Sequence, residues 1–129
     1  MPVQALARGV QLSPRKVGMV VALVRGRTVD DAITILQHTP RRAAIAVRKT
    51  IESARANADY NHHYKPESLH IIEITVSAGP RQKRFRPIAH GMAHPYQHRT
   101  SHIRVVVDGE KRAPKKVTTT TAATTKEKK

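Results

Sequence analysis

The chain has 129 residues, which is enough for one domain with a single core and too few for two. It contains no cysteine, which excludes disulfides, thiolate catalysis and cysteine-containing zinc sites, and no apolar run approaches the ~20 residues of a membrane helix. Its formal net charge is +15, and residues 1–107 alone hold 17 Lys/Arg against 6 Asp/Glu, so an anionic partner, most often nucleic acid, is expected.

The first part of the chain predicts a strand followed by a helix. Residues 3–12 (VQALARGVQL) are compatible with a strand, and Ser13-Pro14 is typical of an N-cap followed by proline at the first helical position. The helix is expected to end at Gly26, because glycine is common just after a helix. Its buried stripe consists of Val17, Val20, Val21 and Val24.

Two further helices follow in the sequence. A short one is expected after Thr28, whose pairing with Asp31 resembles a capping box. Thr39-Pro40 repeats the cap-plus-proline signal, so the longest helix is expected from there to about Ala58. Its core face has 3-4-3-4 spacing and consists of Ala44, Val47, Ile51, Ala54 and Ala58.

One flank of the third helix is basic. Its arginines recur at seven-residue intervals: Arg41, Arg48 and Arg55. On a domain with this net charge, we expect the flank to contact phosphates and not only solvent. An alternative is a helix-turn-helix DNA-binding regulator built from the second and third helices, although the break between them lacks the usual glycine turn.

The second half of the chain predicts a sheet with an unusually long connection. Residues 69–76 and 102–107 have strand patterns, and the segment between them has no helical signal, so a long hairpin is expected at about 79–101. Each arm of about twelve residues could reach roughly 40 Å. Residues 110–129 are polar, basic and threonine-rich, which predicts a disordered tail. We therefore predict an α+β domain over residues 1–109, with three helices packed on a small three-stranded antiparallel sheet.

Histidines recur at every fourth position of the hairpin: His90, His94, His98 and His102. On a helix this spacing would suit a metal site, but Pro87, Gly91 and Pro95 interrupt any helix here. In an extended strand the first and last histidines lie about 40 Å apart, and no carboxylate is near enough in sequence to orient an imidazole. We therefore expect no metal and no other cofactor.

Enzyme chemistry finds no support either. Ser101 and His102 are neighbours in a predicted strand, which points their side chains to opposite faces. Glu52 and Asp59 form no evident acid–base pair, and there is no phosphate-binding glycine loop. We expect no catalytic residues.

A polyanion-binding surface explains the hairpin better. Residues 74–107 contain no Asp or Glu, whose negative charge a phosphate would repel. The two arms carry cations where they leave the globule. The planar guanidinium group of arginine suits bidentate contact with phosphate. These cations are Arg81, Lys83, Arg84, Arg86 and Arg99. Phe85 and Tyr96 could stack on bases or pack on their own hairpin.

These residues carry a family resemblance over about residues 4–107. The segments SPRKVGMVVALVRG, the TP before the third helix, SARANADYNH and GPxxKRFRP…RTSHIxVVV closely resemble the bacterial-type family of large-subunit ribosomal protein twenty-two. The resemblance implies a structural protein of the cytoplasmic large ribosomal subunit, without a membrane partner. It further implies binding to large-subunit rRNA, support of subunit assembly, and a hairpin whose tip lines the nascent-polypeptide exit tunnel near large-subunit protein four.

The resemblance also implies site residues by position. RNA contact carries over to Ser13, Arg15, Lys16, Arg25, Asn57, Asn61, His62, Lys83, Arg84, Arg86, Arg99, Thr100, Ser101 and His102. To these the charge pattern adds Arg41, Arg48 and Arg81, and base stacking adds Phe85. The tunnel-lining tip corresponds to Ile88, Ala89, His90, Gly91, Met92, Ala93 and His94. Many relatives have arginines where this tip has Ile88, His90 and Met92, so we interpret the histidines as replacements for cations in a strip that faces RNA.

Overall fold

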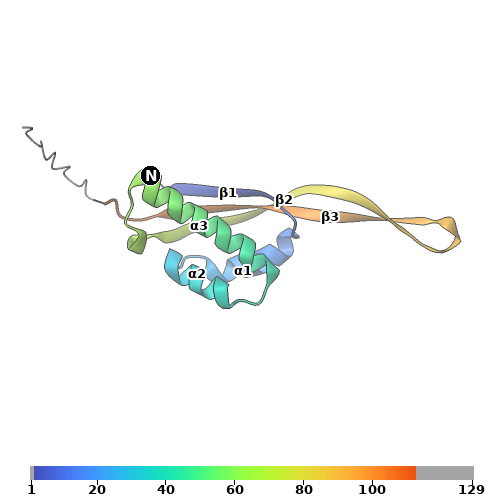
Figure 1. The fold of residues 1–129 in the computed structure, drawn as a ribbon, viewed down its shortest axis with the longest axis horizontal. Coiled ribbons are helices and arrows are strands. Elements are labelled where there is room, and N and C mark those ends of the chain that lie inside the picture. Colours follow the sequence, from blue (N-terminus) through green and yellow to red (C-terminus); the bar gives the residue numbers. More distant parts are fainter. Residues whose placement is uncertain (1, 113–129) are drawn as a thin grey trace, which may run out of the picture.

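The computed structural model describes residues 2–112, which form an α+β fold. The elements are β1 (Val3–Val10), α1 (Pro14–Val24), α2 (Val29–His38), α3 (Arg42–His62), a 3₁₀ turn (Pro66–Ser68), β2 (His70–Pro87), a second 3₁₀ turn (Ala89–Gly91) and β3 (Ala93–Asp108). Figure 1 shows the helices gathered in a globule and a two-stranded hairpin extending from one end of it. The predicted fold class is confirmed.

The sheet has the strand order β1-β3-β2, and both strand pairs are antiparallel. Beyond the pair Ala78–Ser101, β2 and β3 continue without β1 and form the hairpin. A register shift after Ile71 lets Ile71 and Ile74, three residues apart, both face the core. The 3₁₀ turn at the tip closes the hairpin, where the Ile88 N–H donates to the Met92 carbonyl at 2.9 Å.

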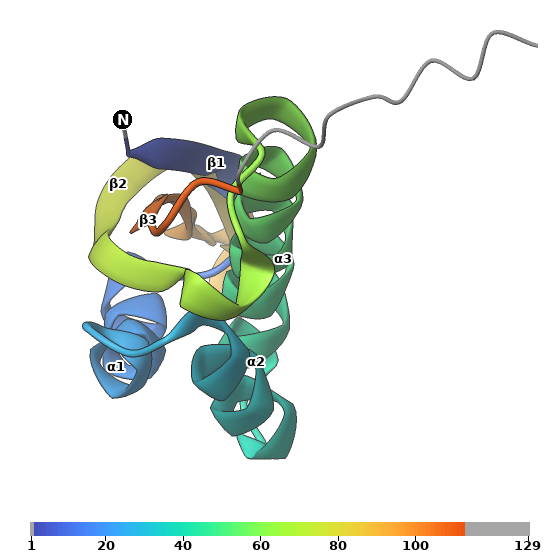
Figure 2. The same ribbon diagram turned by 90° about the vertical axis from the view of Figure 1, so that its left-hand side faces the viewer.

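The core lies between the sheet and the helices. Figure 2 shows α1 and α2 together below the strands and α3 along their side. The predicted valine stripe of α1 and the predicted core face of α3 are both buried, which confirms these two patterns. The strands contribute Val3, Ala5, Ile71, Ile74, Ile103, Val105 and Val107. Within residues 2–112, no helix is long and apolar enough to cross a membrane.

The helix ends follow the predicted capping signals in part. Ser13 is the N-cap of α1, and Gly26 follows that helix with φ +72°, a left-handed conformation that glycine adopts without strain. Thr28 caps α2, where its hydroxyl accepts from the Asp31 N–H at 3.3 Å and donates to the Asp31 carboxylate at 2.7 Å.

The predicted bounds of α3 were wrong at both ends. Its N-cap is Arg41, because Thr39 instead donates its hydroxyl to the Ile35 carbonyl at 2.7 Å and so closes the end of α2. The helix also continues past Ala58 to His62, and the left-handed His63 ends it. The continuation is favoured because it lets the chain turn at His63 and bury the next side chain, Tyr64, in the core.

Tyr64 joins the end of the globule to the C-terminal end of β3. Its ring is 2% exposed, and the flanking backbone is paired by Lys65 N–H to the Glu110 carbonyl and Arg112 N–H to the His63 carbonyl. These bonds attach residues 110–112 to the globule, while the rest of the predicted tail lies outside the described residues and the boundary at residue 109 stays a prediction. Burial, and then the charge of Asp108 and a hydrogen bond to it, raise the pKa of Tyr64 above 10.0.

This environment predicts an alkaline loss of stability. Because the folded-state pKa of Tyr64 is raised, its contribution is fully present below the unfolded pKa of 10.0 and is lost as pH rises through the folded-state value. The free energy of unfolding in urea should therefore fall more steeply above pH 10 in the wild type than in Tyr64→Phe, which has no hydroxyl to ionise. Parallel curves for the two proteins would contradict this assignment.

Candidate nucleic-acid interface

The hairpin leaves the globule at a segment that we call the neck, residues 79–81 of β2 and 99–102 of β3. The pairing of β2 with β3 shifts register between Ala78 and Arg81, and that of β1 with β3 shifts between Ala7 and Val10. Both irregularities lie where the three-stranded sheet becomes a two-stranded hairpin. Such bulges bend and twist a strand, so they set the direction in which the hairpin departs.

Two residues predicted to contact RNA, Thr100 and His102, also form bonds that hold the neck together. Thr100 is 5% exposed and donates its hydroxyl to the Pro80 carbonyl at 2.7 Å, while Ser101 is 0% exposed. His102 accepts the Gly9 N–H on Nδ1 at 3.0 Å, which ties β1 to β3. Thr100 still lines two hollows of the neck surface described below, and RNA contact by Thr100, Ser101 and His102 stays a prediction.

Cations surround the neck. Three adjoining hollows of about 230, 300 and 330 Å³ lie there, and Arg99 lines all of them. The basic neck surface, as we define it, consists of Ser13, Arg15, Lys16, Arg42, Arg81, Arg84 and Arg99. No Asp or Glu lines these hollows, so their potential is positive. The shapes and the charge suit segments of a polyanion.

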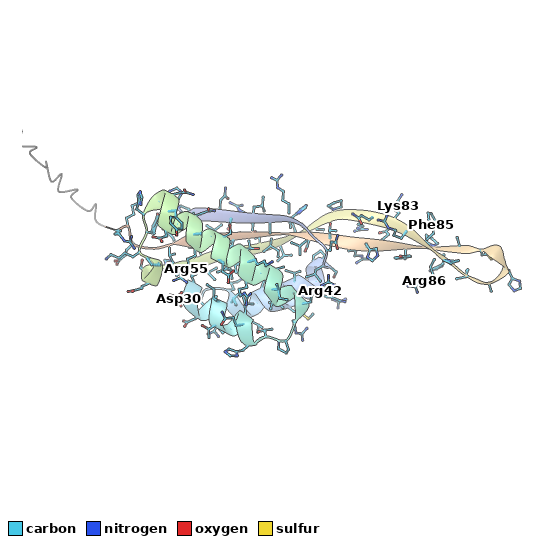
Figure 3. All side chains as sticks on the ribbon, in the orientation of Figure 1. Asp30, Arg42, Arg55, Lys83, Phe85 and Arg86 are labelled. Carbon is cyan, nitrogen blue, oxygen red and sulfur yellow. The ribbon has the colours of Figure 1, made fainter. Side chains whose placement is uncertain are left out.

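Arg42 is a member of this surface that the sequence did not predict. It is the first residue of α3, and Figure 3 shows it at the end of that helix nearest the hairpin. Arg42 and Arg99 are far apart in the sequence, so the sequence gives no sign that both line the same two hollows. The one available signal was the basic start of a helix, which is common on any basic protein.

Two of the three arginines on the basic flank of α3 have a carboxylate partner within the protein. Arg55 lies 2.9 Å from Asp30, and the Arg48 Nε lies 3.3 Å from Glu52 without an aligned hydrogen bond. Arg41 is exposed. Both ion pairs are partly exposed and therefore weak, so phosphate contact by Arg41 and Arg48 along this flank stays a prediction.

The proximal half of the hairpin presents cations on both faces. Successive strand residues alternate, so Lys83 and Phe85 lie on one face and Arg84 and Arg86 on the other, as Figure 3 shows for Lys83, Phe85 and Arg86. Phe85 is 69% exposed and available for stacking. The Arg86 guanidinium lies 5.6 Å from the ring centroid of Tyr96, which packs on its own hairpin.

The distal half of the hairpin is different in character. Residues 87–98 contain no Lys, Arg, Asp or Glu, and His90, His94 and His98 are their only titratable groups besides Tyr96. Ile88 and Met92 are exposed at the tip. In residues 2–112 no group of three or more His, Asp or Glu side chains is placed to hold a metal ion. The facing of these histidines toward RNA stays a prediction.

The remaining predicted contacts lie elsewhere. Arg25 is exposed after α1 and donates to the Ile74 carbonyl at 3.3 Å. Asn57, Asn61 and His62 lie in the last turns of α3. A helix of this length spans about 30 Å, so they are far from the basic neck surface. The structure thus groups the predicted residues into a neck-and-hairpin region and a separate region at the end of α3.

The fold and this surface define a small basic protein with a globule of helices on a sheet and a long, exposed hairpin that carries positive charge. A family model described as ribosomal protein L22p/L17e matches residues 5–108. The chain is also 48% identical over 111 residues to the large ribosomal subunit protein uL22 of Clostridioides difficile (strain 630), covering 86% of this chain and 100% of that one. The chain therefore belongs to the L22p/L17e family of ribosomal proteins, a structural and non-enzymatic family of the large subunit, located on the ribosome in the cytoplasm.

Proposed function

We propose that the chain binds large-subunit rRNA through the basic neck surface and the proximal hairpin. The observation that carries the proposal is the acid-free span of residues 74–107, whose cations stand exposed in the hairpin without intramolecular carboxylate partners among the described ion pairs. Arginine forks would hold phosphates bidentately, and Phe85 would stack on a base. Asn57, Asn61 and His62 would form a second contact at the end of α3.

We further propose that the tip, residues 88–94, lines the nascent-polypeptide tunnel beside large-subunit protein four. Family membership supports this location, and the neutral, partly apolar tip suits a wall past which many peptide sequences must slide. A strongly cationic tip would bind acidic segments and retain them. The globule would anchor the hairpin at the outside of the subunit and support assembly.

The RNA-binding part of the proposal is tested by competition between nucleic acids. The purified chain should prefer a structured large-subunit rRNA fragment to duplex DNA at matched salt. Its log affinity should fall with log salt, with a slope of about −0.7 to −0.9 per neutralised phosphate. Equal affinity for random duplex DNA would favour the helix-turn-helix alternative. That alternative has lost support, since the chain belongs to a family of structural proteins of the large ribosomal subunit.

The tunnel location is tested by crosslinking in translating ribosomes. A photo-reactive side chain at Met92, which is exposed at the tip, should crosslink to the nascent polypeptide. The same group at Arg81, in the neck, should crosslink to rRNA instead. Crosslinks from Met92 to rRNA alone, with no labelled nascent chain, would contradict a tunnel-lining tip.

A further inference from the structure

An apolar groove runs between β1 and α3, and one end of it adjoins the basic neck surface at Leu12 and Arg42. Figure 2 shows the two elements side by side. Two hollows of about 270 Å³ each share residues and form one continuous groove. Its apolar lining includes Leu6, Ala7, Val10, Leu12, Ile45 and Ala46. Leu6 is 50% exposed and Ile45 is 54% exposed, so the groove presents large apolar side chains to its surroundings.

The strand along the groove has an open edge. β1 is the outermost strand of the sheet and pairs only with β3. Its pairing is regular from Val3 to Ala7, before the register shift. About half of the N–H and C=O groups of an edge strand point away from its neighbour, and they offer a template for one more strand.

The groove is also positively charged. Lys49 lines both hollows and Arg42 lines the second, whereas no Asp or Glu lines either of them. The nearest acidic side chain along α3, Glu52, is paired with Arg48 at 3.3 Å. An apolar groove with a cationic rim is complementary to a segment that combines apolar and acidic side chains.

We propose that an extended segment of another protein binds here as an added strand on β1. Its backbone would pair with the regular part of β1, its apolar side chains would enter the groove, and a carboxylate would meet Lys49. RNA would use neither the strand edge nor the leucine and isoleucine surface. A second copy of the chain would oppose like charges, and residues 113–129, which hold five Lys and one Glu, have the wrong charge as well.

The inference goes beyond the proposed RNA contacts and is tested separately from them in purified large subunits that contain the chain. Photo-reactive side chains at Leu6 and at Ile45 should both crosslink to one short segment of one other ribosomal protein, and that segment should contain Asp or Glu. The matched control is Tyr60, which is 78% exposed on α3 and outside the groove. Crosslinks to rRNA from Leu6 and Ile45, or no crosslink at all, would overturn the proposal.

A second measurement covers the case in which these variants do not assemble. Hydrogen exchange at the amides of residues 4–7 in the wild-type chain should slow on assembly into the large subunit, because an added strand protects alternate amides. Lys49→Glu should then reduce this protection. Unprotected amides in the assembled subunit would exclude a strand on this edge.

Discussion

Replacing Arg42 and Arg99 together with alanine is expected to weaken binding to a large-subunit rRNA fragment about a hundredfold. Both side chains line the same two hollows of the basic neck surface. A hydrogen bond to a charged group is worth about 1.5–3 kcal/mol, and solvent screening favours the lower end, so two contacts give about 3 kcal/mol. The log–log salt dependence should also become shallower by about 1.5, because two fewer phosphates are neutralised.

The matched control removes the same charge from a different place. Arg48→Ala with Arg55→Ala also removes two cations, but these are paired with Glu52 and Asp30. Their loss should change the affinity and the salt slope far less. The Glu52 and Asp30 carboxylates would lose their partners, and the net charge would fall only along the flank of α3 and not at the neck. Equal losses in the two double variants would mean that bulk charge, and not the neck geometry, governs binding.

The sequence predicts only in part which of these arginines are free and which are paired with a carboxylate. The acid-free span and its cations were readable from composition alone, since charge exclusion over 34 residues needs no fold. The helix stripes and the paired strands were readable from local periodicity. The Arg48–Glu52 pair was also readable, because the two residues are four apart on one helix. The partner of Arg55 was not, because the Arg55–Asp30 pair joins α3 to α2 and packing alone brings these residues together.

The RTSH segment shows why motif position and role can separate. By resemblance, Thr100, Ser101 and His102 were expected at the RNA surface, yet the first two are buried and the third accepts from Gly9 in β1. A strand alternates its faces only while its register is regular, and here β1 and β2 both shift register against β3. A specific motif can therefore include residues that hold a binding element in place, and whether these residues also touch RNA stays a prediction.

The neck consequently links the stability of the globule to the placement of the hairpin. The cations of the hairpin repel one another without a polyanion, so they contribute no stability to its shape. The bonds at Thr100 and His102 are neutral and local to the neck, and they hold its direction before any partner binds. This division of roles predicts that a change inside the neck disturbs RNA binding without removing any cation.

Gly79→Ala is the sharpest such change. A Cβ at Gly79 would lie 2.5 Å from the Thr100 hydroxyl oxygen and 3.2 Å from the Thr100 carbonyl carbon. The Thr100 side chain cannot move away without losing its bond to Pro80, so we expect a destabilisation of about 1–3 kcal/mol, as for overpacking in a core. Thermal unfolding should shift down by about 4–8 °C per kcal/mol, and rRNA affinity should fall although every cation remains.

Gly18→Ala provides the reference for this substitution. Gly18 lies within α1, where an added Cβ meets nothing within 4 Å, so alanine should stabilise the chain by about 0.5–1 kcal/mol through its helix propensity. Opposite shifts in the two variants would identify the close approach at the neck as the cause. A Gly79→Ala protein with wild-type melting temperature and wild-type rRNA affinity would show that the neck can relax around the added methyl group. The direction of the hairpin would then be set by contact with RNA and not by the fold.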